Sequence, residues 1–315
     1  MLRGLGRIAS LAIVLALATS FVGCSQYAKL QAKQAFKNAN ILYAQQEYKR
    51  AAALYEEVIA KDPSMSVAYF YLANSYDNLY KPSRKGEPDN DEFLTKAINF
   101  YKQASEKEGD PTLRKRSFEF LVAAYGPDKM NDPSQQEPIV QHMIQLDPQD
   151  PANYFALAKI REDAGDYEKA EEVLLQAKQA RPNDPQVFLQ LAGFYNRQEE
   201  FDKTIEALNQ RAAIEPNNPE AFYTTSTYYW DKAYRDFRLK DDEKKAFVMK
   251  GIEQVDKALQ LKSDYMEALT YKNLLLRLQA NLEKDPAKQS SLLKEADRLR
   301  DQALELKKRQ VAGIK

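Results

Sequence analysis

Two consecutive stretches of the sequence repeat each other with a fixed spacing of 34 residues. Residues 154–182 (YFALAKIREDAGDYEKAEEVLLQAKQARP) align with residues 188–216 (FLQLAGFYNRQEEFDKTIEALNQRAAIEP). Equivalent residue types recur in phase at Tyr154 and Phe188, Leu157 and Leu191, Ala158 and Ala192, Tyr167 and Phe201, Ala170 and Thr204, Leu174 and Leu208, and Pro182 and Pro216. A period of this length indicates structural repeats that must stack, because one repeat cannot bury its apolar side chains alone.

The residues inside one period predict a pair of antiparallel helices. Ala158 and Ala170 are small where the two helices are expected to cross, since a larger side chain would hold them apart. Gly165 marks the turn between the helices, and Pro182 cannot continue the second one. Apolar positions three and four apart form the stripe of the second helix: Tyr167, Ala170, Leu174 and Ala177.

This pattern of aromatic, leucine, small, Tyr-x-x-Ala and terminal proline positions resembles the tetratricopeptide repeat. The resemblance implies an all-α solenoid of helical hairpins coiled into a right-handed superhelix. Copies in phase predict about seven repeats, with residues 32–148 holding three (the third degenerate), residues 149–310 holding four, and residues 311–315 forming a tail. Many of the 19 tyrosines then occupy packing positions of the repeats.

Four repeats are expected to carry insertions in the turn between their two helices. The insertions fall around residues 80–92, 126–138, 231–245 and 279–291. Stacking would bring these turns to one edge of the solenoid, and insertions on one face often mark a binding face. Surface turns also tolerate insertions at low entropic cost. Two interpretations therefore stay open: the insertions form a binding face, or they are merely tolerated at the surface.

The N-terminal residues indicate an export signal followed by a lipid anchor. Residues 1–23 combine Arg3 and Arg7 with an apolar run at 8–22 that is short for a bilayer span. The sequence FVGC resembles the lipobox of bacterial lipoproteins, which implies a diacylglyceryl group on Cys24 and a short tether over residues 24–31. Ser25 favours the outer membrane, with the protein facing the periplasm. A signal-anchored inner-membrane protein is the alternative.

Composition and motifs argue against an enzyme. Basic and acidic residues number 46 each, so no strong field favours nucleic acid. The single cysteine excludes an internal disulfide, and His142, the single histidine, lies in a helical stretch. No sequence motif has the spacing of a metal site or of a phosphate-binding loop. We therefore expect no catalytic residue, no metal and no cofactor.

The concave face is the expected binding site for a protein partner. In the tetratricopeptide family, positions 2, 5, 9, 12 and 13 of each first helix line the inner groove. Aromatic rings beside amides there suit an extended peptide or an amphipathic helix. Carried over to this sequence, the groove comprises Phe36, Asn40, Tyr43, Phe70, Asn74, Phe155, Lys159, Leu189, Asn196, Arg197, Tyr223, Thr227 and Trp230.

The combined interpretation is a membrane-anchored scaffold in a bacterial envelope assembly. Its partner would be a peptide or helix segment of an envelope protein, and its membrane contact would be the lipid anchor. A regulator or binding module associated with the cell wall or with glycans is the alternative function.

Overall fold

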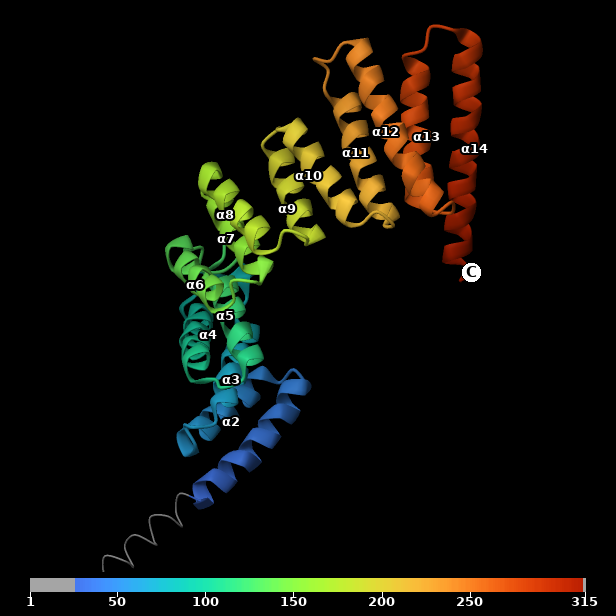
Figure 1. Cartoon of the computed structure of the whole chain (residues 1–315). Helices are drawn as coiled ribbons and strands as arrows, with labels where there is room; N and C mark the ends of the chain where they lie inside the picture. Colours follow the sequence, from blue (N-terminus) through green and yellow to red (C-terminus); the bar gives the residue numbers. More distant parts are fainter. Residues whose placement is uncertain (1–25, 314–315) are drawn as a thin grey trace, which may run out of the picture. The chain divides into compact units, whose positions relative to one another are not determined.

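A computed structural model describes residues 26–313, and every regular element in this part of the chain is a helix (Figure 1). The first helix covers residues 26–44. It includes six residues before residue 32, the predicted start of the first repeat. The others are α2 (Tyr48–Lys61), α3 (Ser66–Leu79), η1 (Pro82–Arg84), α4 (Pro88–Lys107), α5 (Pro111–Tyr125), α6 (Pro133–Leu146), α7 (Pro151–Asp163), α8 (Tyr167–Ala180), α9 (Pro185–Arg197), α10 (Phe201–Ile214), α11 (Pro219–Arg235), α12 (Asp241–Leu261), α13 (Met266–Asn281) and α14 (Pro286–Val311).

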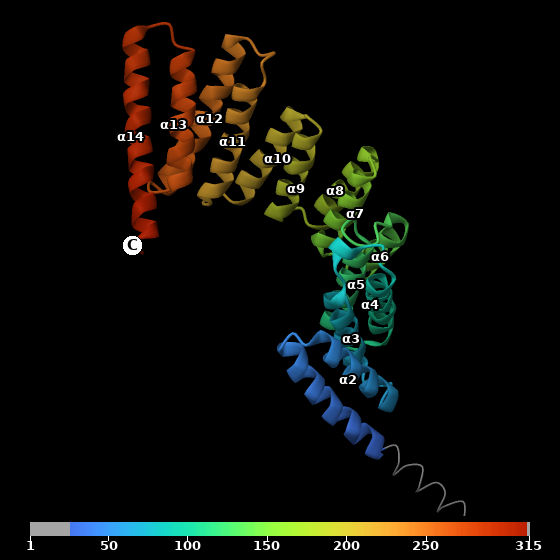
Figure 2. The ribbon, with the colours of Figure 1, turned by 180° about the vertical axis from the view of Figure 1, so that it is seen from behind.

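The helices follow one another in hairpin pairs, and the predicted all-α repeat array is confirmed. The α-helices of residues 26–313 make seven pairs, from 26–44 with α2 through to α13 with α14. Neighbouring pairs such as α11 with α12 and α13 with α14 lie side by side from both directions of view (Figure 1, Figure 2). The right-handed superhelix stays a prediction.

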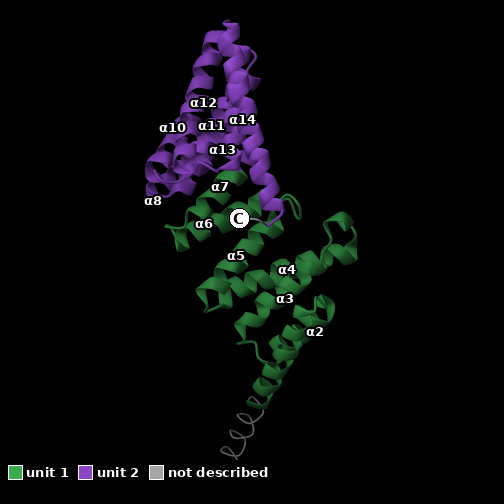
Figure 3. Cartoon of the chain, turned by 90° about the vertical axis from the view of Figure 1, so that its right-hand side faces the viewer, with its two compact units in different colours: residues 1–160 green, residues 161–315 purple. Residues whose placement is uncertain are grey.

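The chain divides into two compact units, residues 1–160 and 161–315 (Figure 3). Compact unit 1 contains the helices from 26–44 to the first ten residues of α7, and compact unit 2 contains the rest. The domain boundary predicted at residue 148 stays a prediction.

Capping residues explain where many of the helices begin. An Asp or Asn followed by Pro precedes several helices, and its side chain accepts a hydrogen bond from a backbone N–H of the first turn. The proline has no N–H to leave unpaired and its fixed φ suits the first helical position. These pairs are Asp110-Pro111, Asp132-Pro133, Asp184-Pro185, Asn218-Pro219 and Asp285-Pro286.

The core of compact unit 1 alternates small residues with tyrosines. Ala39, Ala51 and Ala97 have no exposed surface, which lets successive helices approach closely. Tyr55 and Tyr101 are also fully buried, so the predicted packing role of repeat tyrosines is confirmed at these positions. Burial raises the pKa of both hydroxyls far above the ordinary value, so they pack as neutral groups.

Most of the expected insertion residues are helical rather than looped. In the sixth repeat, α11 has 17 residues and α12 has 21, against 13 in α9 and 14 in α10. In the seventh, α13 has 16 and α14 has 26. The additional residues therefore lengthen the hairpins at their turn ends, which a period count alone could not distinguish from a loop.

The export signal and Cys24 lie outside the described residues. Among residues 26–313, none of the helices combines the length and the apolar character that crossing a membrane requires.

A glycine in α12 allows the sixth and seventh repeats to pack closely. A Cβ placed on Gly251 would lie 2.8 Å from Leu275 Cδ2 and 3.2 Å from Tyr229 Cβ. Gly251 occupies the position that Ala170 holds in the fourth repeat. A methyl group at this point would push α12 away from α11 and α13.

We expect Gly251→Ala to lower the free energy of unfolding by about 1 kcal/mol, because overpacking outweighs the gain in helix propensity. Gly193→Ala is the matched control, since its Cβ would meet only Arg197 Nη1 at 3.4 Å. The free energy of unfolding of Gly193→Ala should rise by about 0.5 kcal/mol. Urea titration followed by circular dichroism measures both, and equal shifts in the two variants would contradict this account of the packing.

Candidate functional site

Five aromatic rings form a continuous row across α11, α13 and Tyr265, the residue that immediately precedes α13. These two helices are the first helices of the sixth and seventh repeats. Ring centroids lie 5.3 Å apart for Tyr265 and Tyr223, 5.4 Å for Tyr223 and Tyr271, and 5.8 Å for Tyr271 and Trp230. Tyr234 completes the row by stacking on Trp230 at 4.8 Å. We call Tyr223, Trp230, Tyr234, Tyr265 and Tyr271 the aromatic row.

The aromatic row presents neutral rings that are only partly covered. Tyr223, Trp230, Tyr265 and Tyr271 are half-buried, and Tyr234 is 63% exposed. Burial raises the pKa of Tyr223 to about 12, with further contributions from Tyr271 and Tyr265, so this hydroxyl is protonated at neutral pH. Such a surface can take apolar side chains and offers hydroxyl groups at ring edges for hydrogen bonds.

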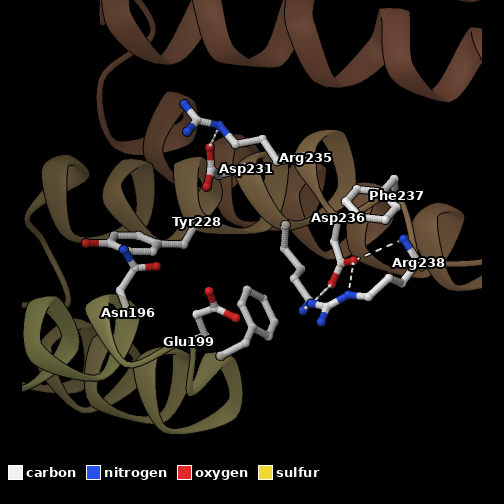
Figure 4. A pocket seen from close by; sticks show the side chains of 10 residues that line it. Asn196, Glu199, Tyr228, Asp231, Arg235, Asp236, Phe237 and Arg238 are labelled. Atoms are coloured by element: carbon white, nitrogen blue, oxygen red, sulfur yellow. Dashed lines mark hydrogen bonds and ion pairs between the residues drawn. The ribbon is translucent and has the colours of Figure 1, made fainter.

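A pocket of about 440 Å³ lies at the turn ends of the fifth and sixth repeats, within compact unit 2 (Figure 4). Asn196 and Glu199 line it from the α9–α10 hairpin, and Asp231 and Arg235 line it from α11. Phe237, in the turn after α11, also lines it and is 88% exposed. The remaining lining residues are Phe201, Tyr228, Lys232, Asp236 and Arg238.

We call this cavity the edge pocket. Its charged groups are largely paired with one another. The Asp236 carboxylate accepts hydrogen bonds from Arg238 Nε and Lys232 Nζ, each at 2.8 Å, and Arg235 pairs with Asp231 at 2.6 Å. The Arg238 and Lys232 bonds hold the pKa of Asp236 far below its usual range. The paired charges stabilise the turn that carries Phe237. The edge pocket therefore has an exposed aromatic ring beside a rim of paired polar groups.

Trp230 and Tyr223 are predicted groove residues, and both belong to the aromatic row. Thr227 lies between them on α11, and its hydroxyl donates to the Thr224 carbonyl at 2.8 Å. Asn196 lines the edge pocket instead. Arg197 is held by Glu162, with Nε 2.6 Å from Oε1.

The other predicted groove residues of the middle repeats differ in exposure. Leu189 on α9 and Phe155 on α7 are half-buried, whereas Lys159 on α7 is exposed. Their role in the groove stays a prediction.

In the first two repeats, predicted groove residues pack on one another. Phe36 and Tyr43 each contact the ring of Tyr71, with centroids 6.2 and 5.4 Å apart. Asn40 accepts a hydrogen bond from Tyr55 at 2.6 Å. Phe70 is 5% exposed and also contacts Tyr71. The contacts of Phe36 and Tyr43 with Tyr71 therefore join the first two repeats, and Phe70 offers little surface to a partner.

Asn74 is the centre of a buried polar network. Only 5% of it is exposed, and its Oδ1 accepts a hydrogen bond from Tyr43 at 2.5 Å. Its Nδ2 donates to the Tyr101 hydroxyl at 3.0 Å. Asp77, next to this network, pairs with Lys129 from the turn between α5 and α6. The Asn74 amide is thus engaged within the fold.

Four aromatic residues of these surfaces do not stand out in the repeat pattern of the sequence: Tyr71, Tyr234, Tyr271 and Phe237. Tyr71 and Tyr271 are both the sixth residue of their first helices, one past the family's fifth position. The recurrence of tyrosine at this point in two repeats was the sequence feature that could have revealed them. Tyr234 and Phe237 lie in or beside the lengthened end of α11, which has no counterpart in the repeat pattern.

No arrangement for metal binding is seen within residues 26–313, where no three His, Cys, Asp or Glu side chains gather as a metal site requires. His142 is exposed on α6, and its ring lies 5.4 Å from the ring of Phe118.

Family comparison agrees with this geometry. Two family profiles described as tetratricopeptide repeat match the chain, over residues 131–192 and residues 36–79. The chain contains tetratricopeptide repeats in these two segments. Repeats of this family form scaffolds for protein–protein interaction, which gives the chain its general function. No enzyme family was found among the matching profiles.

One solved repeat structure shares the fold of this chain, and two further structures match it with lower TM-scores. The C-terminal part of a repeat-containing protein from Cytophaga hutchinsonii is 15% identical, with a TM-score of 0.56, covering 86% of this chain and 98% of its own. MamA from Desulfovibrio magneticus is 16% identical, with a TM-score of 0.39 and coverage of 68% and 96%. YrrB, described as having an unusual peptide-binding site, is 17% identical, with a TM-score of 0.30 and coverage of 75% and 88%. No curated protein matches the chain in sequence.

We expect Asn74→Ala to lower the free energy of unfolding by about 1–3 kcal/mol, because Tyr43 and Tyr101 would lose a buried hydrogen-bonding partner. Asn38→Ala is the control, since Asn38 is exposed and accepts only from Gln34 at 3.2 Å. It should change stability by less than about 0.5 kcal/mol. Thermal unfolding of both variants tests this, and an equally small effect of Asn74→Ala would show that its amide does not hold the repeats together.

Proposed function

We propose that this tetratricopeptide repeat protein is a membrane-anchored scaffold that binds a segment of a partner protein in a bacterial envelope assembly. The aromatic row is the binding face in this proposal. The single observation that carries it is the partial exposure of five contacting rings on adjacent first helices. Exposed contiguous aromatic surface of this kind is typical of interaction sites.

The chemistry of the aromatic row suits a peptide or helix better than a charged ligand. Rigid rings supply large contact area at low entropic cost, and aromatic residues dominate the binding energy of many interfaces. Trp230 lies between Tyr234 and Tyr271 in the row, where an apolar anchor side chain could contact all three rings. Apolar anchors spaced along one face of a partner helix would match such a row.

The membrane anchor in this proposal is a lipid on Cys24. It is supported by the lipobox resemblance and by the apolar run before it. Two or more acyl chains hold a protein firmly on a bilayer, at about 0.8 kcal/mol per buried methylene. Ser25 supports placement at the outer membrane, facing the periplasm.

We expect Trp230→Ala to reduce the recovery of the partner at least tenfold in affinity purification from crosslinked host membranes, because a large aromatic anchor is worth about 2 kcal/mol or more. Tyr234→Ala should reduce recovery severalfold without changing the melting temperature, since that ring is mainly exposed. Tyr167→Ala is the control, because this exposed tyrosine lies on α8 outside the row. Unchanged recovery with both row variants would exclude the aromatic row as the binding face.

We expect Cys24→Ala to release the protein from the membrane fraction and to abolish incorporation of labelled fatty acid. The loss of the thiol removes the only attachment point for the diacylglyceryl group. Cell fractionation with immunoblotting measures this. Full retention of Cys24→Ala in the inner membrane would instead support the signal-anchored alternative.

A further inference from the structure

The first helix carries an unusual distribution of charge. Residues 26–44 contain three lysines and no acidic residue, and the first acid along the described chain is Glu47. The whole sequence, in contrast, is balanced at 46 basic and 46 acidic residues. Basic charge is therefore concentrated in the described helix that lies nearest to Cys24 in the sequence.

These lysines form one exposed line along the helix. Lys29, Lys33 and Lys37 follow one another at intervals of four residues, so they share a face, and all three are exposed. None of them forms an ion pair with another residue of the described chain, whereas many other lysines and arginines do. Their charge is available to an external anion.

An exposed apolar line runs beside the lysines. Tyr27 and Leu30 are 64% and 65% exposed, and Ile41 is 49% exposed on the same side. Their spacing of three and fourteen residues places them on one face of a helix. The opposite face, with Ala32, Ala35 and Ala39, is buried in the core of compact unit 1. The outward face is thus amphipathic in itself.

We infer that the outward face of residues 26–44 lies on an anionic lipid surface. The lysines contact lipid phosphates and headgroups, while Tyr27 and Leu30 enter the interface, the arrangement found in helices that lie in the membrane plane. The position of the helix at the membrane rests on the proposed anchor, because only Ser25 separates Cys24 from residue 26. Such contact would orient the first repeat relative to the bilayer.

Charge decides between lipid and a protein partner for this face. A protein partner for this face would need an acidic surface complementary to the three lysines. An anionic bilayer supplies negative charge next to the anchor, and each lysine near such a surface contributes about fivefold to binding. Salt should weaken the contact, because the lysines are exposed.

The test uses the full chain purified from bacterial membranes and reconstituted into vesicles. A fluorescent amino acid replaces Leu30, and lipids with brominated acyl chains quench it only when the side chain enters the bilayer. Vesicles contain phosphatidylcholine alone or together with phosphatidylglycerol. We expect quenching in the phosphatidylglycerol vesicles that weakens with added salt and falls at least tenfold in the Lys29→Gln, Lys33→Gln, Lys37→Gln variant.

Control variants separate this inference from the proposed anchor. Lys294→Gln, Lys307→Gln and Lys308→Gln remove three exposed lysines from α14 and should leave quenching unchanged. A vesicle-bound chain without quenching in either lipid would overturn the inference while the anchor stands. If lipidation of Cys24 fails, lysine-dependent quenching in a Cys24→Ala chain would still support lipid contact by the helix. Quenching insensitive to salt and to the first three lysines would contradict the electrostatic contact.

Discussion

The structure depends on the close approach of successive helices, which small residues at their crossing points permit. Ala39, Ala51, Ala97 and Ala258 are fully buried, and Gly251 leaves no room for even a methyl group beside Leu275. A helix pair with only a narrow apolar stripe cannot be stable alone, so the contact between pairs supplies the core. Small residues recur in phase with the 34-residue period, as Ala158 and Ala192 do.

Tight packing at the crossing points decides where the large rings can go. Tyr55 and Tyr101 fill the space between repeats and are fully covered. Other rings lie on a different face of their helices. Trp230 and Tyr271, for example, contact each other across neighbouring first helices and keep part of their surface in solvent. The same stacking that forms the core therefore produces a row of aromatic side chains, and the lengthened end of α11 extends it to Tyr234.

Sequence reasoning predicted the fold well because the period, the small residues and the proline ends all follow from local helix rules. The groove itself stays a prediction. Tyr223 and Trp230 belong to one aromatic row, whereas Phe70 and Asn74 are buried by their neighbours. The position of a residue in a repeat predicts the direction in which its side chain points. The exposure of that side chain also depends on the size of the residues in the next repeat. Tyr271 was missed because it is the sixth residue of its helix, a position that the family's groove pattern does not include. The helical character of residues 231–235 could not be read from repeat length.

The most direct test of the account is a comparison of two photocrosslinking probes in living cells, with Cys24 intact. One probe replaces Trp230 in the aromatic row, and the other replaces Phe237, the exposed ring of the edge pocket. Mass spectrometry identifies the adducts. The account predicts a specific envelope protein crosslinked from position 230 and lost when Tyr223 is replaced by alanine. Adducts that form only from position 237 would contradict it and place the binding site at the lengthened turn ends.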